Sequence, residues 1–404
     1  MKSPLKLKNN GSMLAIVMVL VAITSVIGVA VLALGAQKRL FAINTASEIS
    51  ARCAADAALA EAYFVMGQKL AEGALSGANP SLPQVTDRPL PNCDATYSYK
   101  VTASSIMAAT DYEIEAVGRC GGTEKKVIAT IGFGGPFEYA VFVKDSIVLK
   151  PGTTIDGYNY GTGPKTLQVG TNSIKPDKII LGKGTSIDGD VVVGVGGDPK
   201  VVINAPIGTT ITGRTYALSE EVQLPAVTVP TWLASMPSNG TITGAATITT
   251  SGKYDGISVG QSKVITINAP VTLYVTGAIN LSNNAQLQVS NANPNASLTL
   301  YLGGEFNGKN GGTTNNLTKD PKRMKIYGLD TCSNINMATA GTFYGAIYAP
   351  DTGINLKSTV EIYGSVVANN INQSSAANIH YDASLRDASK DDAGVRLVFK
   401  RWSE

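Results

Sequence analysis

The residues best able to do chemistry are a few acids and one histidine in the C-terminal two thirds of the sequence. Asp156 and Asp188 each stand in an Ile-Asp-Gly triplet, Asp190 follows closely, and His380 is the only histidine. Converging carboxylates could bind calcium or serve as the acid and base of a polysaccharide-cleaving enzyme. Aspartate before glycine is, however, typical of turns, where its side chain bonds the local backbone. We therefore favour turns and predict no catalytic residue, metal site or cofactor.

His380 could act as a general base. Its sequence neighbours are Tyr381 and Asp382, and no serine or cysteine nucleophile is marked beside it. We predict a structural, hydrogen-bonding role in the last coil of the domain described below. The 16 tyrosines could include a carbohydrate-binding platform or could simply stack along the edge of a repeated structure, and both interpretations stay open.

The charge pattern argues against a nucleic-acid partner. Lys and Arg number 33 against 30 Asp and Glu, and only 16% of residues are charged. No basic stripe lies outside the first ten residues, and nucleic-acid binding requires one. The glycine clusters at 118–122 and 194–197 lack the Lys-Ser/Thr pair of a phosphate-binding loop.

The four cysteines suit an exported chain, in which disulfides can form. Cys93 lies just before one predicted strand and Cys120 just after the next, so we predict a disulfide between them. A Cys53–Cys332 pair is one of the remaining options, because four cysteines allow three connectivities. No pair has the Cys-x-x-Cys spacing of a zinc site.

The elements that must position these residues begin with an uncharged apolar run from Gly11 to Ala36. About 20 apolar residues suffice to cross a bilayer as a helix. Three lysines within residues 1–10 favour a cytoplasmic N-terminus, although Lys38 and Arg39 on the far side weaken the asymmetry. The run is too long for the apolar core of a cleaved secretory signal. The remainder of the chain is then exported.

The same helix is predicted to continue past the membrane. No Gly or Pro occurs from Ala36 to Met66, and apolar or small residues recur at helical spacing along one face. The face comprises Ala42, Ala46, Ile49, Cys53, Ala57, Ala60 and Phe64. We expect one helix over 12–72, roughly 90 Å long.

The stretch Asn10-Gly11-Ser12-Met13-Leu14-Ala15-Ile16 resembles the start of type IV pilin-like proteins, and more closely the pilus assembly family of the PilX type. The resemblance implies that a prepilin peptidase cleaves after Gly11, so that Ser12 becomes the mature N-terminus. It also implies that the helix packs with other pilin-like subunits. Major pilins carry Glu at the fifth mature position, where this chain has Ile16, which points to a minor subunit.

After the leader (1–11) and the helix, we expect a linker and then a small antiparallel sheet. The Pro- and Gly-rich segment 73–95 is predicted to be a linker. Alternating residues at 97–102, 112–117 and 126–131 predict an antiparallel meander over 96–136, with a hairpin at Gly121-Gly122.

From 137 to 385, short apolar segments alternate with turn residues, and short sequence motifs recur. Thr153–Gly157 recurs at 185–189 and 209–213, and a Tyr-Gly motif recurs at 326–328, 343–345 and 362–364. Such periods predict a parallel β-helix. We expect insertions at 217–240 and 303–321, where this pattern stops, and a C-terminal cap at 386–404.

The segments Asn268–Gly277, Phe343–Pro350 and Ile379–Asp382 resemble an uncharacterised β-helical domain that follows PilX-like N-termini. That resemblance implies no known catalytic activity.

The predicted fold is therefore mainly β: a long transmembrane helix, a small antiparallel sheet and a parallel β-helix. The predicted function is a non-enzymatic minor pilin-like subunit of a type IV pilus or type II secretion-like filament. It would sit in the bacterial inner membrane and display the β-helix for adhesion or assembly. Expected partners are pilin-like subunits, the prepilin peptidase and a surface or carbohydrate ligand. The alternatives are a membrane-tethered polysaccharide lyase or hydrolase, and a permanently anchored surface protein.

Overall fold

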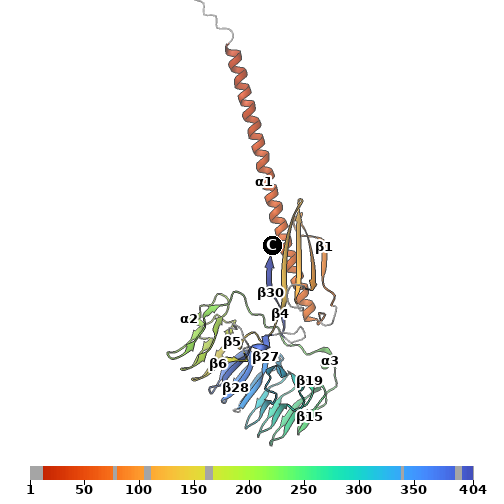
Figure 1. The fold of residues 1–404 in the computed structure, drawn as a ribbon, viewed down its shortest axis with the longest axis vertical. Helices are drawn as coiled ribbons and strands as arrows, with labels where there is room; N and C mark the ends of the chain where they lie inside the picture. The colour runs from red at the N-terminus through yellow and green to blue at the C-terminus, as the bar shows by residue number, and fades with distance from the viewer. Residues whose placement is uncertain are drawn as a thin grey trace, which may run out of the picture. The chain divides into compact units, whose positions relative to one another are not determined.

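The computed structural model describes residues 12–75, 80–103, 111–159, 167–337, 341–386 and 394–403. The chain forms two compact units, Met1–Gly132 with Phe399–Glu404, and Phe133–Val398. The predicted fold class is confirmed: one long helix, an antiparallel sheet and a large array of parallel strands (Figure 1). The predicted leader, 1–11, lies outside the described residues.

The helix α1 spans Ser12–Ala71, close to the predicted range. Its described apolar side chains are exposed from Leu14 to Ile43. Further along, one face is buried against the sheet of the same unit; it comprises Ala51, Ala54, Ala55, Ala58, Leu59, Ala62 and Met66. This is not the face that the sequence spacing singled out, because Cys53, Ala60 and Phe64 are exposed. The buried face is alanine-rich because the strands lie very close: a Cβ on Gly118 would be 2.0 Å from the Ala51 carbonyl oxygen.

The first unit contains a five-stranded sheet in the order β1-β2-β3-β4-β30. The strands are β1 Gln84–Pro89, β2 Thr96–Ala103, β3 Tyr112–Cys120, β4 Thr123–Gly134 and β30 Arg396–Ser403. The predicted meander and its Gly121-Gly122 hairpin are β2 to β4. Part of the predicted linker is instead the strand β1, which pairs antiparallel with β2.

The C-terminal segment does not cap the β-helix as predicted, because β30 is an edge strand of this first sheet. Two contacts explain the placement. The Lys400 ammonium lies 2.7 Å from a carboxylate oxygen of the buried Asp111, which needs a cation. The Phe399 ring stacks on Tyr63 of α1 with 4.6 Å between centroids.

The second unit is a solenoid of parallel strands around a Val-, Ile- and Leu-rich core. One group of coils comprises β5 Val141–Val148, β6 Thr154–Tyr158, β7 Gln168–Thr171, β8 Ile179–Ile180, β9 Ser186–Ile187, β10 Asp190–Val193, β11 Ile203–Asn204, β12 Thr210–Ile211 and β13 Thr215–Ala217, with the short helix α2 Pro199–Val202. The second group begins with β14 Thr241–Ile242, β15 Ala246–Ile248, β16 Gly252–Tyr254, β17 Gly256–Val259, β18 Val264–Ile267, β19 Pro270–Val275, β20 Ile279–Leu281 and β21 Gln286–Val289. It continues with β22 Ser297–Leu302, β23 Phe306–Gly308, β24 Thr313–Asn316, β25 Met324–Gly328, β26 Asn334–Met337, β27 Gly341–Leu356, β28 Val360–Gln373 and β29 Asn378–Asp382.

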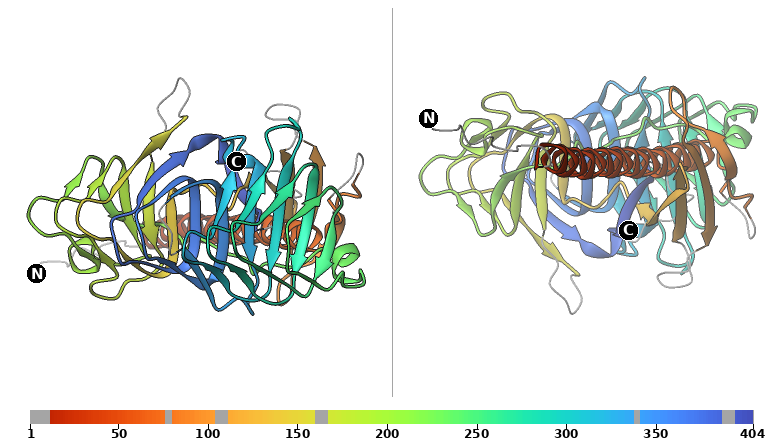
Figure 2. Two further views of the ribbon diagram at one scale, coloured as in Figure 1. Left: turned by 90° about the horizontal axis from the view of Figure 1, so that it is seen from below. Right: turned by 90° about the horizontal axis from the view of Figure 1, so that it is seen from above.

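The coils do not stack in chain order from one end to the other. β5 lies in the middle of the solenoid, because it pairs in parallel with both β7 and β28, and β6 likewise pairs with both β9 and β29. The first group runs outward from this middle to one end. The second group starts at the other end and runs back to it, so blue strands lie beside yellow ones in Figures 1 and 2.

The segment predicted as an insertion at 217–240 connects these two ends. We call residues 218–240 the strap; it includes the short helix α3 Thr231–Ala234. Its Val222, Val227 and Leu233 are buried against an outer aromatic row of the solenoid. The row contains Tyr274, Tyr301, Tyr327 and Tyr348 in register on successive coils. The Tyr348 hydroxyl donates a hydrogen bond to the Pro225 carbonyl oxygen at 2.7 Å.

The predicted insertion at 303–321 is wrong, because β23 and β24 continue the regular coils there. The apolar signal is missing because inward positions are polar: Thr314 and Asn316 are both buried. The Asn316 amide is satisfied by the carbonyl oxygens of Asp320 and Tyr344, at 2.8 and 3.0 Å.

The predicted motif repeats are confirmed in part. Ile155, Ile187 and Ile211 are in register on β6, β9 and β12. The Tyr-Gly motifs at 343–345 and 362–364 also align. The motif at 326–328 instead aligns with Ile347-Tyr348-Ala349, so it belongs to the row under the strap.

Candidate functional site

The solenoid brings His380 together with two acids from other coils. Its Nδ1 lies 2.5 Å from Asp156 Oδ1 on β6, and its Nε2 lies 2.7 Å from Glu361 Oε2 on β28. The structural, hydrogen-bonding role predicted for His380 therefore fits, but its partners are neither Tyr381 nor Asp382. The coil of His380 is also not the end of the solenoid, since β6 stacks on β29.

The two carboxylates determine the charge of the ring. Both ring nitrogens face a carboxylate oxygen, so both donate when the ring is an imidazolium. Partial burial alone would lower the pKa of His380, but the hydrogen bonds to Glu361 and Asp156 outweigh it, and the pKa is raised above its ordinary value. The side chain is 17% exposed. When protonated, the ring is thus a partly buried cation between two carboxylates.

An aromatic column adjoins this cluster. The rings of Tyr344 and Tyr363 stack at 4.6 Å between centroids, and Tyr363 stacks on the His380 imidazole at 4.4 Å. Tyr158 meets Tyr363 edge-on at 4.9 Å. Both faces of the Tyr363 ring are therefore covered, by Tyr344 and His380, and its hydroxyl group is the part left for other partners.

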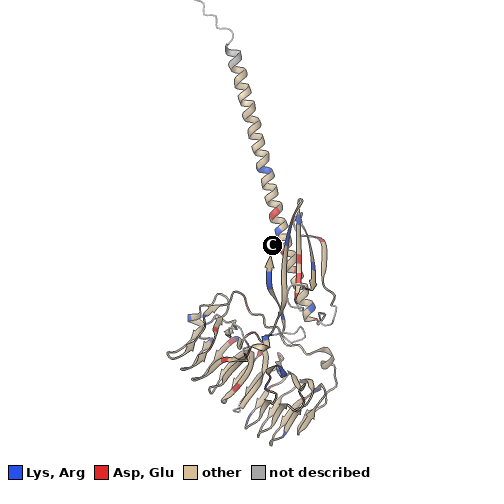
Figure 3. Cartoon of the chain, viewed as in Figure 1, with Lys and Arg blue, Asp and Glu red and all other residues tan. Residues whose placement is uncertain are grey.

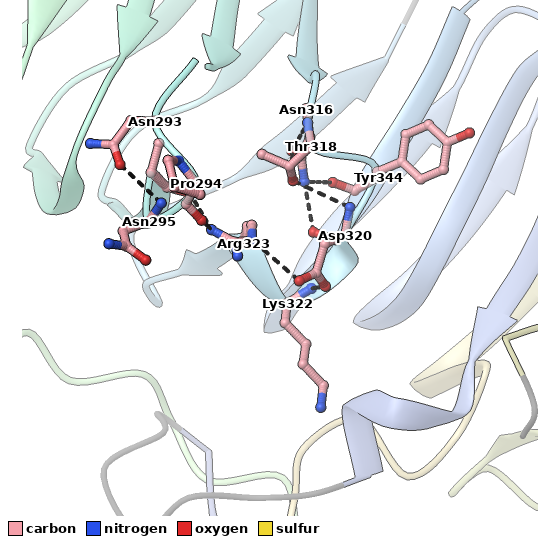
Figure 4. A network of polar contacts seen from close by, with 10 residues as sticks. Asn293, Pro294, Asn295, Asn316, Thr318, Asp320, Lys322, Arg323 and Tyr344 are labelled. Carbon is pink, nitrogen blue, oxygen red and sulfur yellow. Dashed lines mark hydrogen bonds and ion pairs between the residues drawn. The ribbon is translucent and has the colours of Figure 1, made fainter. Parts of the chain in front are cut away.

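A corner network positions the first tyrosine of the column (Figure 4). Asp320 accepts a hydrogen bond from the Lys322 amide at 3.0 Å and thereby caps the 3₁₀ turn η1, Pro321–Arg323. Arg323 binds the Asp320 carboxylate at 3.3 Å. Asn316 joins this turn to the Tyr344 carbonyl oxygen and so holds the start of the column.

The other predicted acids do not join the cluster as a catalytic pair. Asp188 accepts a hydrogen bond from Thr212 Oγ1 at 2.8 Å. Asp190 is buried and accepts one from the Arg214 amide at 2.7 Å. Asp156 and Glu361 each bind a ring nitrogen of His380, so both carboxylates are engaged by the imidazole. Among the residues that the structure describes, no group of three His, Cys, Asp or Glu side chains could hold a metal ion.

The raised pKa of His380 predicts a pH-dependent contribution to stability. An unfolded histidine has a pKa of about 6.5. Because the folded pKa is higher, the stabilisation is fully present below about pH 6.5 and is lost as pH rises through the folded pKa. His380→Gln should therefore lower the free energy of unfolding more at about pH 6 than at about pH 9. Urea denaturation at both pH values measures this.

The matched control is Asp188→Asn, which has no contact with His380 and should show no such trend. A loss in His380→Gln that stays constant or grows with pH would contradict the imidazolium assignment.

The four cysteines are free thiols in the structure. Cys93 lies in the β1–β2 loop, three residues before Thr96, and Thr96 pairs with Arg119 beside Cys120. Both cysteines thus lie at one end of the first sheet. Cys120 also lines a shallow pocket of about 290 Å³ with Asp94 and Glu124. The Cys93–Cys120 disulfide stays a prediction for the exported, oxidised protein.

We expect non-reducing peptide mapping of envelope-isolated protein to show Cys93 linked to Cys120. Loss of a native bridge of this kind costs roughly 2–5 kcal/mol in a small secreted domain. A Cys93→Ser/Cys120→Ser variant should therefore unfold earlier than wild type only under oxidising conditions. Alkylation of both thiols in untreated protein would show that the bridge does not form.

Comparison with known proteins covers part of the chain. Residues 215–388 match the model of a family described as a domain of unknown function (DUF7305). No curated protein matches the chain. Among solved structures, it is similar to the competence-associated pilin ComZ from Thermus thermophilus, at 12% identity over 88% of this chain and 97% of that chain, with a TM-score of 0.24. The family match covers the strap and the second group of coils.

Proposed function

We propose that the chain is a non-enzymatic, minor pilin-like subunit that is anchored by α1 and displays the solenoid for adhesion or filament assembly. The supporting observation is the exposed apolar surface of α1. It is the one helix, among the described residues, that is long and apolar enough to cross a membrane. Its membrane half carries no charged side chain before Lys38 (Figure 3).

This apolar surface extends beyond what a bilayer covers. The hydrocarbon core is about 30 Å thick and takes about 20 residues, which the run before Lys38 supplies. Beyond that charge, Leu40, Phe41 and Ile43 remain exposed, Phe41 at 78%. Large apolar side chains left in water favour association, so we infer that neighbouring helices of a filament cover them.

The absence of an acid at the fifth mature position supports a minor subunit. That position is Ile16, which is apolar and exposed on α1. In this proposal the N-terminus is cytoplasmic, α1 spans the inner membrane, and the two folded units are exported. The partners are other pilin-like subunits and the prepilin peptidase.

N-terminal sequencing of membrane-extracted protein tests the proposal. We expect the mature chain to begin at Ser12, because the peptidase would cut after Gly11. Gly11 lies outside the described residues, so this site rests on sequence. Gly11→Val should leave the precursor intact. Sheared filaments should contain wild-type chain and lack this variant.

Two results would contradict this proposal. A start at Ala36 would indicate a secretory signal. An intact Met1 in wild-type protein would indicate a permanently anchored surface protein.

A further inference from the structure

One outer face of the solenoid carries two in-register columns of hydrogen-bonding side chains, which we call the polar face. The first column has two runs: Thr247, Thr266, Gln288 and Asn315 on one sheet, and Tyr344, Tyr363, His380, Asp156, Asp188 and Thr212 on another. The two runs adjoin where the Asn316 amide meets the Tyr344 carbonyl oxygen. The second has Gln286 and Thr313 on the first sheet, and Thr342, Glu361, Asn378, Thr154, Ser186 and Thr210 on the other. The strap lies over a different row, that of Tyr274 to Tyr348.

The composition of the polar face restricts its partner. Neither column contains Lys or Arg, and the ionisable acids and base are Asp156, Asp188, Glu361 and His380, which is a cation only when protonated. The three carboxylates outnumber the one cation, so an anionic polymer would be repelled. The remaining groups are almost all hydroxyls and amides, each able to donate and accept a hydrogen bond. This pattern complements a ligand that is itself rich in hydroxyl groups and uncharged.

The spacing of the polar face suits an extended ligand. Neighbouring parallel strands lie about 4.7–4.9 Å apart, so the continuous run from Tyr344 to Thr212 is roughly 24 Å long. Hydrogen-bonding groups are therefore repeated at a regular interval over a length that matches several linked sugars. A compact small molecule would use only a fraction of it.

We propose that the polar face binds a neutral polysaccharide, with the Tyr344–Tyr363–His380 column as its centre. This inference rests on the proposed function, since it names the ligand of the displayed solenoid. Tyr363 cannot stack on a sugar ring, because Tyr344 and His380 occupy its two faces, so the contacts to sugar are made through the tyrosine hydroxyl groups. Burial raises the pKa of Tyr363, with Tyr344 and Glu361 adding to the effect, so its hydroxyl keeps its proton.

The test uses full-length protein in detergent and a panel of neutral hexasaccharides derived from glucan, mannan, galactan and xylan. Isothermal titration should show binding to at least one of them. The Tyr344→Phe/Tyr363→Phe variant keeps both stacked rings and removes only the hydroxyls. We expect it to bind at least tenfold more weakly. The control Tyr274→Phe removes a hydroxyl from the row under the strap and should leave affinity unchanged.

Three results would overturn the inference. They are failure to bind any neutral hexasaccharide, equal binding by the double variant, and preferential binding of an anionic alginate hexasaccharide. The binding assay does not depend on N-terminal processing. A chain that begins at Ser12 but binds no glycan would refute the ligand alone, whereas a glycan-binding chain with an intact Met1 would refute the pilin-like role alone.

Discussion

Gly364→Ala should strongly destabilise the solenoid. Gly364 lies on β28 at φ +149°, and a Cβ there would be 1.8 Å from the carbonyl oxygen of Gly345 on the neighbouring coil. That oxygen belongs to backbone and cannot rotate away. Gly345 and Gly364 are also paired in register, and Gly364 pairs with Tyr381 on its other side, so the strand is held from both sides. We expect a loss of about 3–5 kcal/mol, at the upper end for point substitutions.

The matched control is Gly244→Ala in the same unit. No atom lies within 4 Å of the Cβ that this substitution adds. Its stability should stay within about 0.5 kcal/mol of wild type. Urea unfolding followed by near-ultraviolet circular dichroism, which reports the solenoid tyrosines, measures both variants. Equal stability of the two would mean that β27 and β28 do not stack in this register.

The elements predicted correctly from sequence are those that a local pattern specifies. α1 is an apolar run followed by an alanine-rich stretch with no Gly or Pro from Ala36 to Met66, and β2 to β4 alternate with period 2. β1 was missed because its residues are mostly exposed, so it lacks the buried alternation of a strand. β30 was misplaced because its neighbour β4 lies far away in sequence, and no local pattern reports such a pairing.

The solenoid was predictable as a class but not in its order. Its repeated turns and short apolar segments indicate that coils stack. They do not indicate which coil stacks on which. Because β5 lies between β7 and β28, the strap must carry the chain from one end of the solenoid to the other. The change in composition at 217–240 does not reveal this connection.

The same topology explains why the candidate site could not be assembled from sequence. Asp156 and His380 were each noticed, but they are 224 positions apart and meet only because β6 stacks on β29. Glu361, Tyr344 and Tyr363 were missed as partners of His380. A signal existed: Ile379-His380-Tyr381 aligns with the recognised motif Ile362-Tyr363-Gly364, 17 residues earlier.

Leu233→Ala should produce the second large effect, because it loosens the strap. The Leu233 side chain is 0% exposed and belongs to the apolar cluster between the strap and the tyrosine row. Truncation removes buried methyl groups and leaves a cavity, which typically costs about 2–5 kcal/mol for leucine. The cavity can collapse little, since the tyrosines beneath it are fixed in register on four successive coils.

The neighbouring Trp232 supplies the control, since its side chain is 50% exposed. Trp232→Ala removes a larger side chain but less buried surface, so its effect on the free energy of unfolding should be smaller than that of Leu233→Ala. Urea denaturation ranks the two variants. Limited proteolysis locates the change, because a loosened strap should be cut within 218–240 before the solenoid unfolds. If Trp232→Ala proved the more damaging of the two, or if Leu233→Ala were cut no faster than wild type, the strap would not be held by its buried leucine.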